Sequence, residues 1–317
     1  MHFSRDDFVE ILSTYDSGEF HQAQMLTRGG VQSSYLLTTS DTRVVFKYYQ
    51  TRTVPYVNFE ANLIEYIRRR DFPCPAVLRN KEGILTGEFK GKPFLIYEHI
   101  EGEHLQSLDE DQRRSVIKAA ADLQHVTRYY RPAFRKARWH YIPKTIRKLA
   151  QDAAERSTQP FAQEKLAWIE SQLNELSFSS RVPKGVCHSD YDLSNLLFKN
   201  GRFIALLDFD DANYTFLSFD LINLIDNWAW SLTDGFDPEF AREIVETYRI
   251  VRELKTDEKM RLFDVHKLQI LVDSLWFFDR WEGDDFYERE KINYLNDFGR
   301  DAYHETLLRP EKIIVSG

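Results

Sequence analysis

Residues 187–198 read CHSDYDLSNLLF, a stretch in which a histidine, Asp190 and Asn195 follow the spacing H-x-D-x-x-x-x-N. Asp208 follows Asp190 by 18 positions. Between Asn195 and Asp208, two short runs of strand-forming residues flank a Lys-Asn-Gly turn at 199–201, which predicts a tight β-hairpin. That hairpin should bring Asp208 back beside Asn195, so that two carboxylates and one amide oxygen gather at one end of a β-ribbon.

Oxygen ligands in this order are typical of phosphoryl transfer, because catalysis of that reaction depends mainly on positioning and on neutralising charge. Asp190 is the candidate base, which orients the acceptor hydroxyl and accepts its proton. Mg²⁺ prefers hard oxygen ligands and takes one or two protein carboxylates beside phosphate oxygens and waters. We therefore predict Asn195 and Asp208 as Mg²⁺ ligands, and we expect His188 to brace the loop.

Upstream, a glycine pair separates two strand-like segments, and hydroxyl side chains follow it. Glycines let a backbone approach phosphate groups, while serine hydroxyls and amides donate hydrogen bonds to them. The candidate nucleotide-loop residues are Gly29, Gly30, Ser33 and Ser34. Lys47, near the end of the following strand, is placed to contact the nucleotide phosphates. Glu60 on the next expected helix is the candidate partner of Lys47, with Glu65 as the alternative.

None of these motifs is specific by itself. A glycine pair is usually a hairpin turn, a strand lysine is usually solvated, and a helix glutamate is usually an exposed charge. Their order along the chain is the stronger signal: glycine turn, strand lysine, helix glutamate, loop with aspartate and asparagine, then a hairpin that ends in aspartate. This order predicts a nucleotide-dependent phosphotransferase.

Residue patterns divide the 317-residue chain into two parts. Residues 1–98 combine strand-like segments with an opening helix, which Ser4 caps, and an inserted helix at 56–70; they predict a small antiparallel-sheet lobe that binds the nucleotide. Residues 99–317 predict a larger, mainly helical lobe with the catalytic loop and the acceptor site. The fold class is therefore α+β, with two lobes. The helices expected in the larger lobe span 109–129, 141–155, 161–177, 218–230, 237–253, 257–280 and 286–306.

We expect ATP to bind in the cleft between these lobes. The connector at 95–100 passes from one lobe to the other, so its backbone is placed to contact the adenine. Glu98 and Ile100 are the candidate residues in this connector. ATP and Mg²⁺ are thus the predicted cofactors.

Charge and composition exclude several classes of partner. The formal net charge is −8 without a concentrated basic patch, which argues against nucleic acid. No run approaches the roughly 18 apolar residues of a membrane span, and the first residues lack the basic start and apolar stretch of a signal peptide. Two cysteines without metal-site spacing fit a reducing compartment. We therefore expect a cytoplasmic protein without a membrane partner.

The layout resembles the aminoglycoside phosphotransferase and choline kinase superfamily, whose members have a protein-kinase-like fold. CHSDYDLSNLLF is similar to the catalytic motif of that superfamily, and ALLDFDDA is similar to its metal-binding segment. RGGVQSSYLLTT, DFPCPAVLRNKEG, SFDLINLIDNWAW and TYRIVREL resemble stretches of bacterial type II homoserine kinases. The resemblance implies an ATP-dependent kinase that acts on a small hydroxylated amine or amino acid. It supports the roles given above to Asp190, Asn195, Asp208 and Lys47.

Acidic and aromatic residues follow the catalytic loop closely. A wall of this kind suits an acceptor that bears an ammonium group, through charge pairing and cation–π contact, and an arginine suits a carboxylate. Trp228 and Trp230 lie two positions apart on an expected helix and cannot share one face, so at least one is expected in the core. Asp220 is expected to anchor the helical lobe instead. The candidate acceptor-site residues are Asp192, Asp210, Asp211, Asp226, Trp228 and Arg280.

Other functions remain open at this point. A protein kinase is disfavoured, because no D-F-G followed by A-P-E marks an activation segment. A non-catalytic member of the fold, with a structural or binding role, is disfavoured because the base, the metal ligands and the strand lysine are all present. Among small-molecule acceptors, homoserine-like amino alcohols come first, and aminoglycosides or choline-like amines are the alternative.

Overall fold

Two compact units build the chain. The computed structural model describes residues 3–26, 32–231, 233–279 and 286–309. One unit comprises Met1–Leu108, Val126–Arg138 and Leu193–Ala212; the other comprises Asp109–His125, Trp139–Asp192 and Asn213–Gly317. Each unit is thus assembled from three segments of the chain, and the simpler division after residue 98 stays a prediction.

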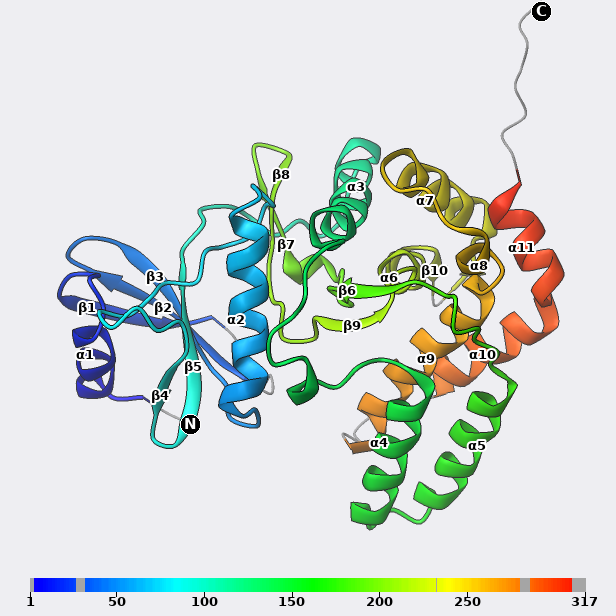
Figure 1. Ribbon diagram of the computed structural model, residues 1–317, viewed down its shortest axis with the longest axis horizontal. Helices are drawn as coiled ribbons and strands as arrows, with labels where there is room; N and C mark the ends of the chain where they lie inside the picture. The colour runs from blue at the N-terminus through cyan, green and yellow to red at the C-terminus, as the bar shows by residue number, and fades with distance from the viewer. Residues whose placement is uncertain (1–2, 27–31, 232, 280–285, 310–317) are drawn as a thin grey trace, which may run out of the picture. The chain divides into compact units, whose positions relative to one another are not determined.

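The first unit is built on a five-stranded antiparallel sheet with the strand order β1-β2-β3-β5-β4 (Figure 1). In β2, buried positions alternate with half-buried ones, as in a strand with one face on a core. Ser34 of β2 pairs with Lys47 of β3, which sets the register beside the candidate phosphate-binding lysine. The strands are β1 (Phe20–Met25), β2 (Ser33–Thr39), β3 (Arg43–Tyr48), β4 (Gly87–Phe89) and β5 (Lys92–Glu98).

An aromatic core closes one face of this sheet. Helix α1 (Arg5–Ser13) begins with the predicted cap, in which Ser4 and Asp7 form a reciprocal capping box. Phe8 of α1 contacts Tyr35 and Phe46, with ring centroids 5.2 and 5.8 Å apart. Because successive strand residues point to opposite faces, the side chain of Lys47 lies on the other face from Phe46.

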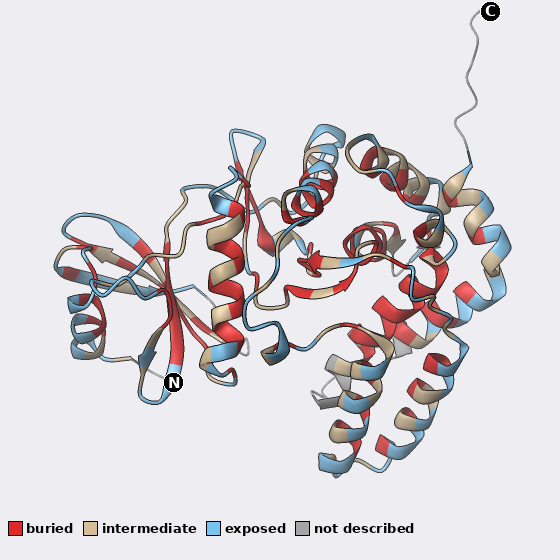
Figure 2. Cartoon of the chain, viewed as in Figure 1, coloured by how far each residue is buried: buried red, intermediate tan, exposed pale blue. Residues whose placement is uncertain are grey.

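Helix α2 (Val54–Arg68) is the inserted helix that the sequence predicts. Pro55 lies in its first turn, where a missing N–H costs nothing, and Asp71 at φ 59° follows its end. Eight of its residues are buried, among them Glu60. Figure 2 shows buried residues in red along this helix. A carboxylate on the buried face of a helix needs a partner, and Lys47 and Tyr97 supply it, as described below.

The hairpin of β7 (Leu196–Lys199) and β8 (Arg202–Leu206) belongs to the first unit. Asn200 and Gly201 at its turn have φ of 51° and 74°, the left-handed pair that a two-residue hairpin loop requires. Strand β7 also pairs with Glu103, whose N–H donates to the Phe198 carbonyl at 2.8 Å. Gly102 permits this close approach, because a Cβ there would lie 2.7 Å from the Phe198 oxygen.

The second unit is mainly helical. Within it, α6 packs on α9, α7 on α11 and α4 on α9. A short ribbon, which no sequence pattern predicts, pairs β6 (Lys184–Cys187) with β9 (Asn213–Phe216). Along the chain, these strands precede and follow the segment that carries Asp190, the candidate base. The helices are α3 (Glu110–Thr127), whose last residues belong to the first unit, α4 (Pro143–Arg156), α5 (Ala162–Glu175), α6 (Phe219–Trp228), α7 (Pro238–Val251), α8 (Thr256–Lys259), α9 (Leu262–Asp279), α10 (Phe286–Phe298) and α11 (Arg300–Leu308).

Three expected helices differ from those observed. The helix expected at 257–280 is divided into α8 and α9 by a turn, and the helix expected at 286–306 is divided into α10 and α11. Gly299, at φ 82° and ψ 146°, makes the second break, because this backbone conformation, which favours glycine, lies far from helical geometry. The helix expected at 218–230 ends at Trp228, and Trp230 lies in β10 (Trp230–Ser231), which pairs with β11 (Gly235–Phe236). No helix in the described part of the chain has both the length and the apolar character needed to cross a membrane.

Candidate active site

Lys47 is a buried cation between two carboxylates of the first unit. Its Nζ lies 2.6 Å from Asp208 Oδ1 and 4.0 Å from Glu60 Oε1. Burial lowers the pKa of this ammonium, but the charges of Asp208, Glu60 and Asp210 outweigh it and hold the pKa above its ordinary value. Lys47 therefore stays protonated and presents a fixed positive charge beside Asp208.

Glu60 is the carboxylate that fixes Lys47. It is fully buried, and Tyr97 donates its hydroxyl to Glu60 Oε1 at 2.7 Å, while the hydroxyl of Tyr49 lies 2.9 Å from that of Tyr97. Burial raises the pKa of Glu60, and Lys47 opposes that rise. The alternative candidate, Glu65, pairs instead with arginine side chains at the surface. The structure thus places Glu60, rather than Glu65, beside the strand lysine.

Asn195 and Asp208 lie at the same end of the β7–β8 ribbon. The Leu207 N–H donates to the Asn195 carbonyl at 2.8 Å, so the residues that flank the hairpin are brought together as their spacing suggests. Asp208 adopts φ 56°, and its Oδ1 accepts the Asp210 N–H at 3.1 Å. A carboxylate and an amide oxygen are ligands that suit Mg²⁺, so the chemistry of this donor set fits that ion.

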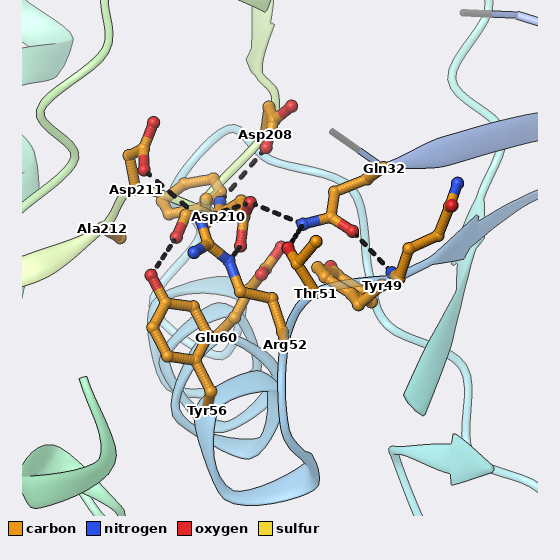
Figure 3. A network of polar contacts seen from close by, with 12 residues as sticks. Gln32, Tyr49, Thr51, Arg52, Tyr56, Glu60, Asp208, Asp210, Asp211 and Ala212 are labelled. Atoms are coloured by element: carbon orange, nitrogen blue, oxygen red, sulfur yellow. Dashed lines mark hydrogen bonds and ion pairs between the residues drawn. The ribbon is translucent and has the colours of Figure 1, made fainter. Parts of the chain in front are cut away.

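Asp210 and Asp211, in the same unit, both form ion pairs with Arg52 (Figure 3). Arg52 binds both carboxylate oxygens of Asp210 at 3.2 Å, and its Nη2 lies 3.9 Å from Asp211 Oδ1. Burial, together with the charge of Asp210, raises the pKa of Asp211 to about 6. These two candidate acceptor-site residues are therefore engaged with a buried arginine of the chain itself.

The segment of the second unit that carries Asp190, the candidate base, is held by helix α6. Asp220 accepts the N–H groups of His188 and Ser189 at 3.2 and 2.9 Å, and Asn223, one turn further on, accepts the Tyr191 N–H at 2.8 Å. Asp190 lies between these anchored residues, and its N–H donates to His188 Nδ1 at 3.3 Å. Burial raises the pKa of Asp220 to about 7, against the lowering effect of these two N–H donors. Asp220 thus anchors the loop, within which His188 accepts the Asp190 N–H.

The candidate nucleotide residues are placed in part. Ser33 is buried and accepts a hydrogen bond from Gln50 Nε2 at 2.8 Å. Glu98 ends β5; its N–H donates to the Ala76 carbonyl at 2.9 Å, and its carboxylate accepts from Arg68 at 2.9 Å. Ile100 follows it and is half-buried. Gly29 and Gly30 lie outside the described residues.

The other acceptor candidates lie in the second unit. Asp192 is exposed. Asp226 is buried on α6, one turn beyond Asn223, with Oδ2 2.8 Å from Lys291 Nζ and Oδ1 3.2 Å from His266 Nε2. Trp228 is the last residue of α6, and Arg280 lies outside the described residues. Asp210 and Asp211 therefore lie with Arg52 in the first unit, whereas Asp226 pairs with Lys291 and His266 in the second.

Several side chains around these groups carried no sequence motif. Tyr97 faces Glu60. It lies two residues after Leu95, the register partner of Lys47, and because side chains alternate along a strand, this spacing places Tyr97 on the same face of the sheet as Leu95. Arg52 and Asn223 had no such signal, because their partners lie far away in the sequence. Lys291 also had no such signal, because it donates to Asp226 from another helix.

The fold and this arrangement of lysine, glutamate, aspartate and asparagine define a kinase of protein-kinase-like architecture. A model of the phosphotransferase enzyme family matches residues 25–263. Homoserine kinase of Bartonella tribocorum is 24% identical over 282 residues, with 86% of each chain covered. An amicoumacin kinase bound to AMP-PNP and Ca²⁺ superposes with a TM-score of 0.68 at 16% identity, with 94% of each chain covered. Choline kinase of Cryptosporidium parvum superposes with a TM-score of 0.66 at 14% identity over 96% of this chain and 98% of its own.

The chain belongs to the phosphotransferase enzyme family, whose model covers well over half of it. It is a small-molecule kinase, and membership of this family implies that it uses ATP. The α+β, protein-kinase-like fold predicted from the sequence is confirmed, and so is the resemblance to aminoglycoside phosphotransferases, choline kinases and homoserine kinases.

Proposed function

We propose that this kinase transfers the γ-phosphate of ATP, with Mg²⁺, to the hydroxyl of a small acceptor that also bears an amine, with homoserine or a related amino alcohol as the first candidate. The observation that carries the proposal is the contact of Lys47 with Glu60 and Asp208 at the end of the ribbon that also carries Asn195. This is the set of groups that phosphoryl transfer requires beside a base.

Each residue has a separate task. Lys47, kept protonated by its carboxylate neighbours, binds and neutralises phosphate oxygens. Asn195 and Asp208 would hold Mg²⁺, which screens the charge that develops on the phosphates. Asp190, held between the anchored residues His188 and Tyr191, orients the acceptor hydroxyl and accepts its proton as the oxygen attacks the phosphorus.

The names of relatives favour an acceptor that bears an amine, but Asp226 is not its binding group, because this carboxylate is buried and pairs with Lys291 Nζ at 2.8 Å. The relative from Bartonella is named as a kinase of homoserine and a fold neighbour as a kinase of choline, and both of these acceptors are hydroxylated amines.

The test is phosphorylation of an acceptor panel by the purified protein with Mg²⁺ and ATP. The panel contains homoserine, other hydroxy-amino acids, choline, aminoglycosides and methylthioribose. One acceptor with strong turnover identifies the substrate. No turnover on any amine would contradict the proposal.

A further inference from the structure

Arg52 is a buried arginine to which the mechanism above gives no role. It lies two residues before α2 and is 8% exposed. Its Nε and Nη2 each donate to one carboxylate oxygen of Asp210 at 3.2 Å, and its guanidinium lies 4.5 Å from the centre of the Tyr56 ring (Figure 3). A stacked guanidinium that binds both oxygens of a carboxylate fixes the orientation of that carboxylate, which a flexible ammonium does not.

Asp210 is also held through its backbone. The Tyr56 hydroxyl donates to the Asp210 carbonyl at 3.3 Å. Gln32, whose Oε1 accepts the Gln50 N–H at 2.8 Å, approaches Asp210 Oδ2 with its Nε2 at 3.5 Å, the outer limit of a hydrogen bond (Figure 3). The side chain of Asp210 is therefore held by Arg52 and Gln32, and its backbone carbonyl is held by Tyr56.

The fixed residue acts directly on Asp208. The Asp210 N–H donates to Asp208 Oδ1, the same oxygen that contacts Lys47 Nζ at 2.6 Å. Asp208 has the left-handed φ of 56°, which is unfavourable for a residue with a Cβ and persists only where its surroundings hold it. The position of the Asp208 carboxylate therefore depends on the position of Asp210.

We propose that Arg52 is a positioning residue for phosphoryl transfer, which acts through Asp210 to hold the Asp208 carboxylate in its metal-binding orientation. The inference rests on the proposed role of Asp208 as a metal ligand. Arg138 offers a contrast, because it donates to the carbonyl oxygens of Phe209 and Ala212 at 2.9 Å each and so supports the same segment through its backbone. Arg138 therefore supports the backbone, whereas Arg52 binds the carboxylate of Asp210, whose N–H donates to Asp208.

The experiment compares Arg52→Gln, Asp210→Asn, their double variant and Arg52→Lys with the wild type. The first readout is the affinity of Mn²⁺ for the protein–ADP complex, measured by electron paramagnetic resonance, which needs no acceptor. The second is kcat and KM for ATP. Arg69→Gln is the control, because Arg69, at the C-terminal cap of α2, pairs with Glu65 at 2.9 Å and has a side chain that is 68% exposed. Near-ultraviolet circular dichroism checks that each variant is folded.

We expect Arg52→Gln to weaken Mn²⁺ binding and to lower kcat, each by about 10–100-fold, as the loss of a group that orients a metal ligand typically does. Arg52→Lys keeps the charge without the two-pronged contact and should recover only part of the loss. The double variant should be no worse than Arg52→Gln alone, because both substitutions break one interaction. Arg69→Gln should match the wild type.

Mn²⁺ affinity and kcat within twofold of the wild type in Arg52→Gln would overturn the proposal, and so would effects of Arg52→Gln and Asp210→Asn that multiply in the double variant. If Arg52→Gln does not fold, the test uses Asp210→Asn, which keeps the shape of the side chain. Mn²⁺ affinity and kcat within twofold of the wild type in that variant would overturn the proposal. A wild type that binds Mn²⁺–ADP but phosphorylates no acceptor would contradict the proposed function alone, since the Mn²⁺ readout still tests Arg52.

Discussion

Replacing Lys47 by methionine should destabilise the first unit by an amount that depends on pH. The substitution removes the cation that faces Glu60 at 4.0 Å, and Glu60 is fully buried. At an effective dielectric constant of about 20, two unit charges at this distance attract each other by about 4 kcal/mol. The contact with Asp208 adds less than about 1 kcal/mol, because that carboxylate is 46% exposed and solvent screens it.

The unpaired Glu60 can relieve part of this cost by binding a proton. Burial raises its pKa above the ordinary 4.5 while Lys47 opposes the rise, so removal of Lys47 raises the pKa further. A carboxyl whose pKa is higher in the folded state contributes its full stability below about pH 4.5, and that contribution is lost as the pH rises through the folded-state pKa. The loss caused by Lys47→Met should therefore be smaller at pH 5 than at pH 8, where the lost attraction sets its scale at about 3–4 kcal/mol, or roughly 10 °C in melting temperature.

Calorimetry at both pH values tests this reasoning. A second substitution, Glu60→Gln, removes the buried charge, so Lys47→Met/Glu60→Gln should recover most of the stability lost at pH 8. Lys90→Met is the matched control, because Lys90 pairs with Asp7 at an exposed site, and its melting temperature should match that of the wild type at either pH. Equal losses at pH 5 and pH 8, without recovery in the double variant, would refute the account of Glu60.

Three further substitutions test other parts of the molecule. Asp208→Ala should abolish the Mg²⁺ dependence of ADP binding, measured by titration calorimetry with and without the ion, while ADP binding without Mg²⁺ persists. Burial raises the pKa of Asp220 to about 7. The stability that its protonated form contributes is therefore complete below about pH 3.8 and is lost as the pH rises through about 7. In Asp220→Asn, the melting temperature should decline less steeply with pH. Gly102→Ala should lower the free energy of unfolding by about 1–3 kcal/mol in urea, because its Cβ would meet Leu197 and the Phe198 carbonyl at 2.7 Å.

Local signals explain how much of this fold the sequence reveals. Asn200-Gly201 is the turn that a two-residue hairpin needs, and the hairpin places Asn195 and Asp208 without further information. The helical period of α2 and the alternation of β3 are equally local, and together they turn Glu60 toward Lys47. Short-range periodicity therefore suffices for the groups that lie along the chain in a fixed order.

Long-range pairing explains what the sequence does not reveal. Asp210 was expected in an acidic wall around the acceptor, yet it is bound by Arg52, which lies 158 residues earlier. Asp226 pairs with Lys291, which lies on another helix 65 positions later in the chain. Ion pairs of this kind depend on how helices and strands pack, and neither spacing nor composition marks them. The charge of an aspartate in a sequence therefore does not tell whether it faces a substrate or an arginine of its own chain.

The most direct test of the central claim is the transfer of phosphate from ATP to the acceptor that the panel identifies, with product detected by ³¹P nuclear magnetic resonance for the wild type and for Asp190→Ala. We predict a phosphate ester on the acceptor hydroxyl in the wild type and turnover reduced by about 10²–10⁴-fold in Asp190→Ala, with ATP binding retained. Turnover close to the wild-type value in Asp190→Ala would contradict the assignment of the base and, with it, the proposed mechanism of phosphoryl transfer.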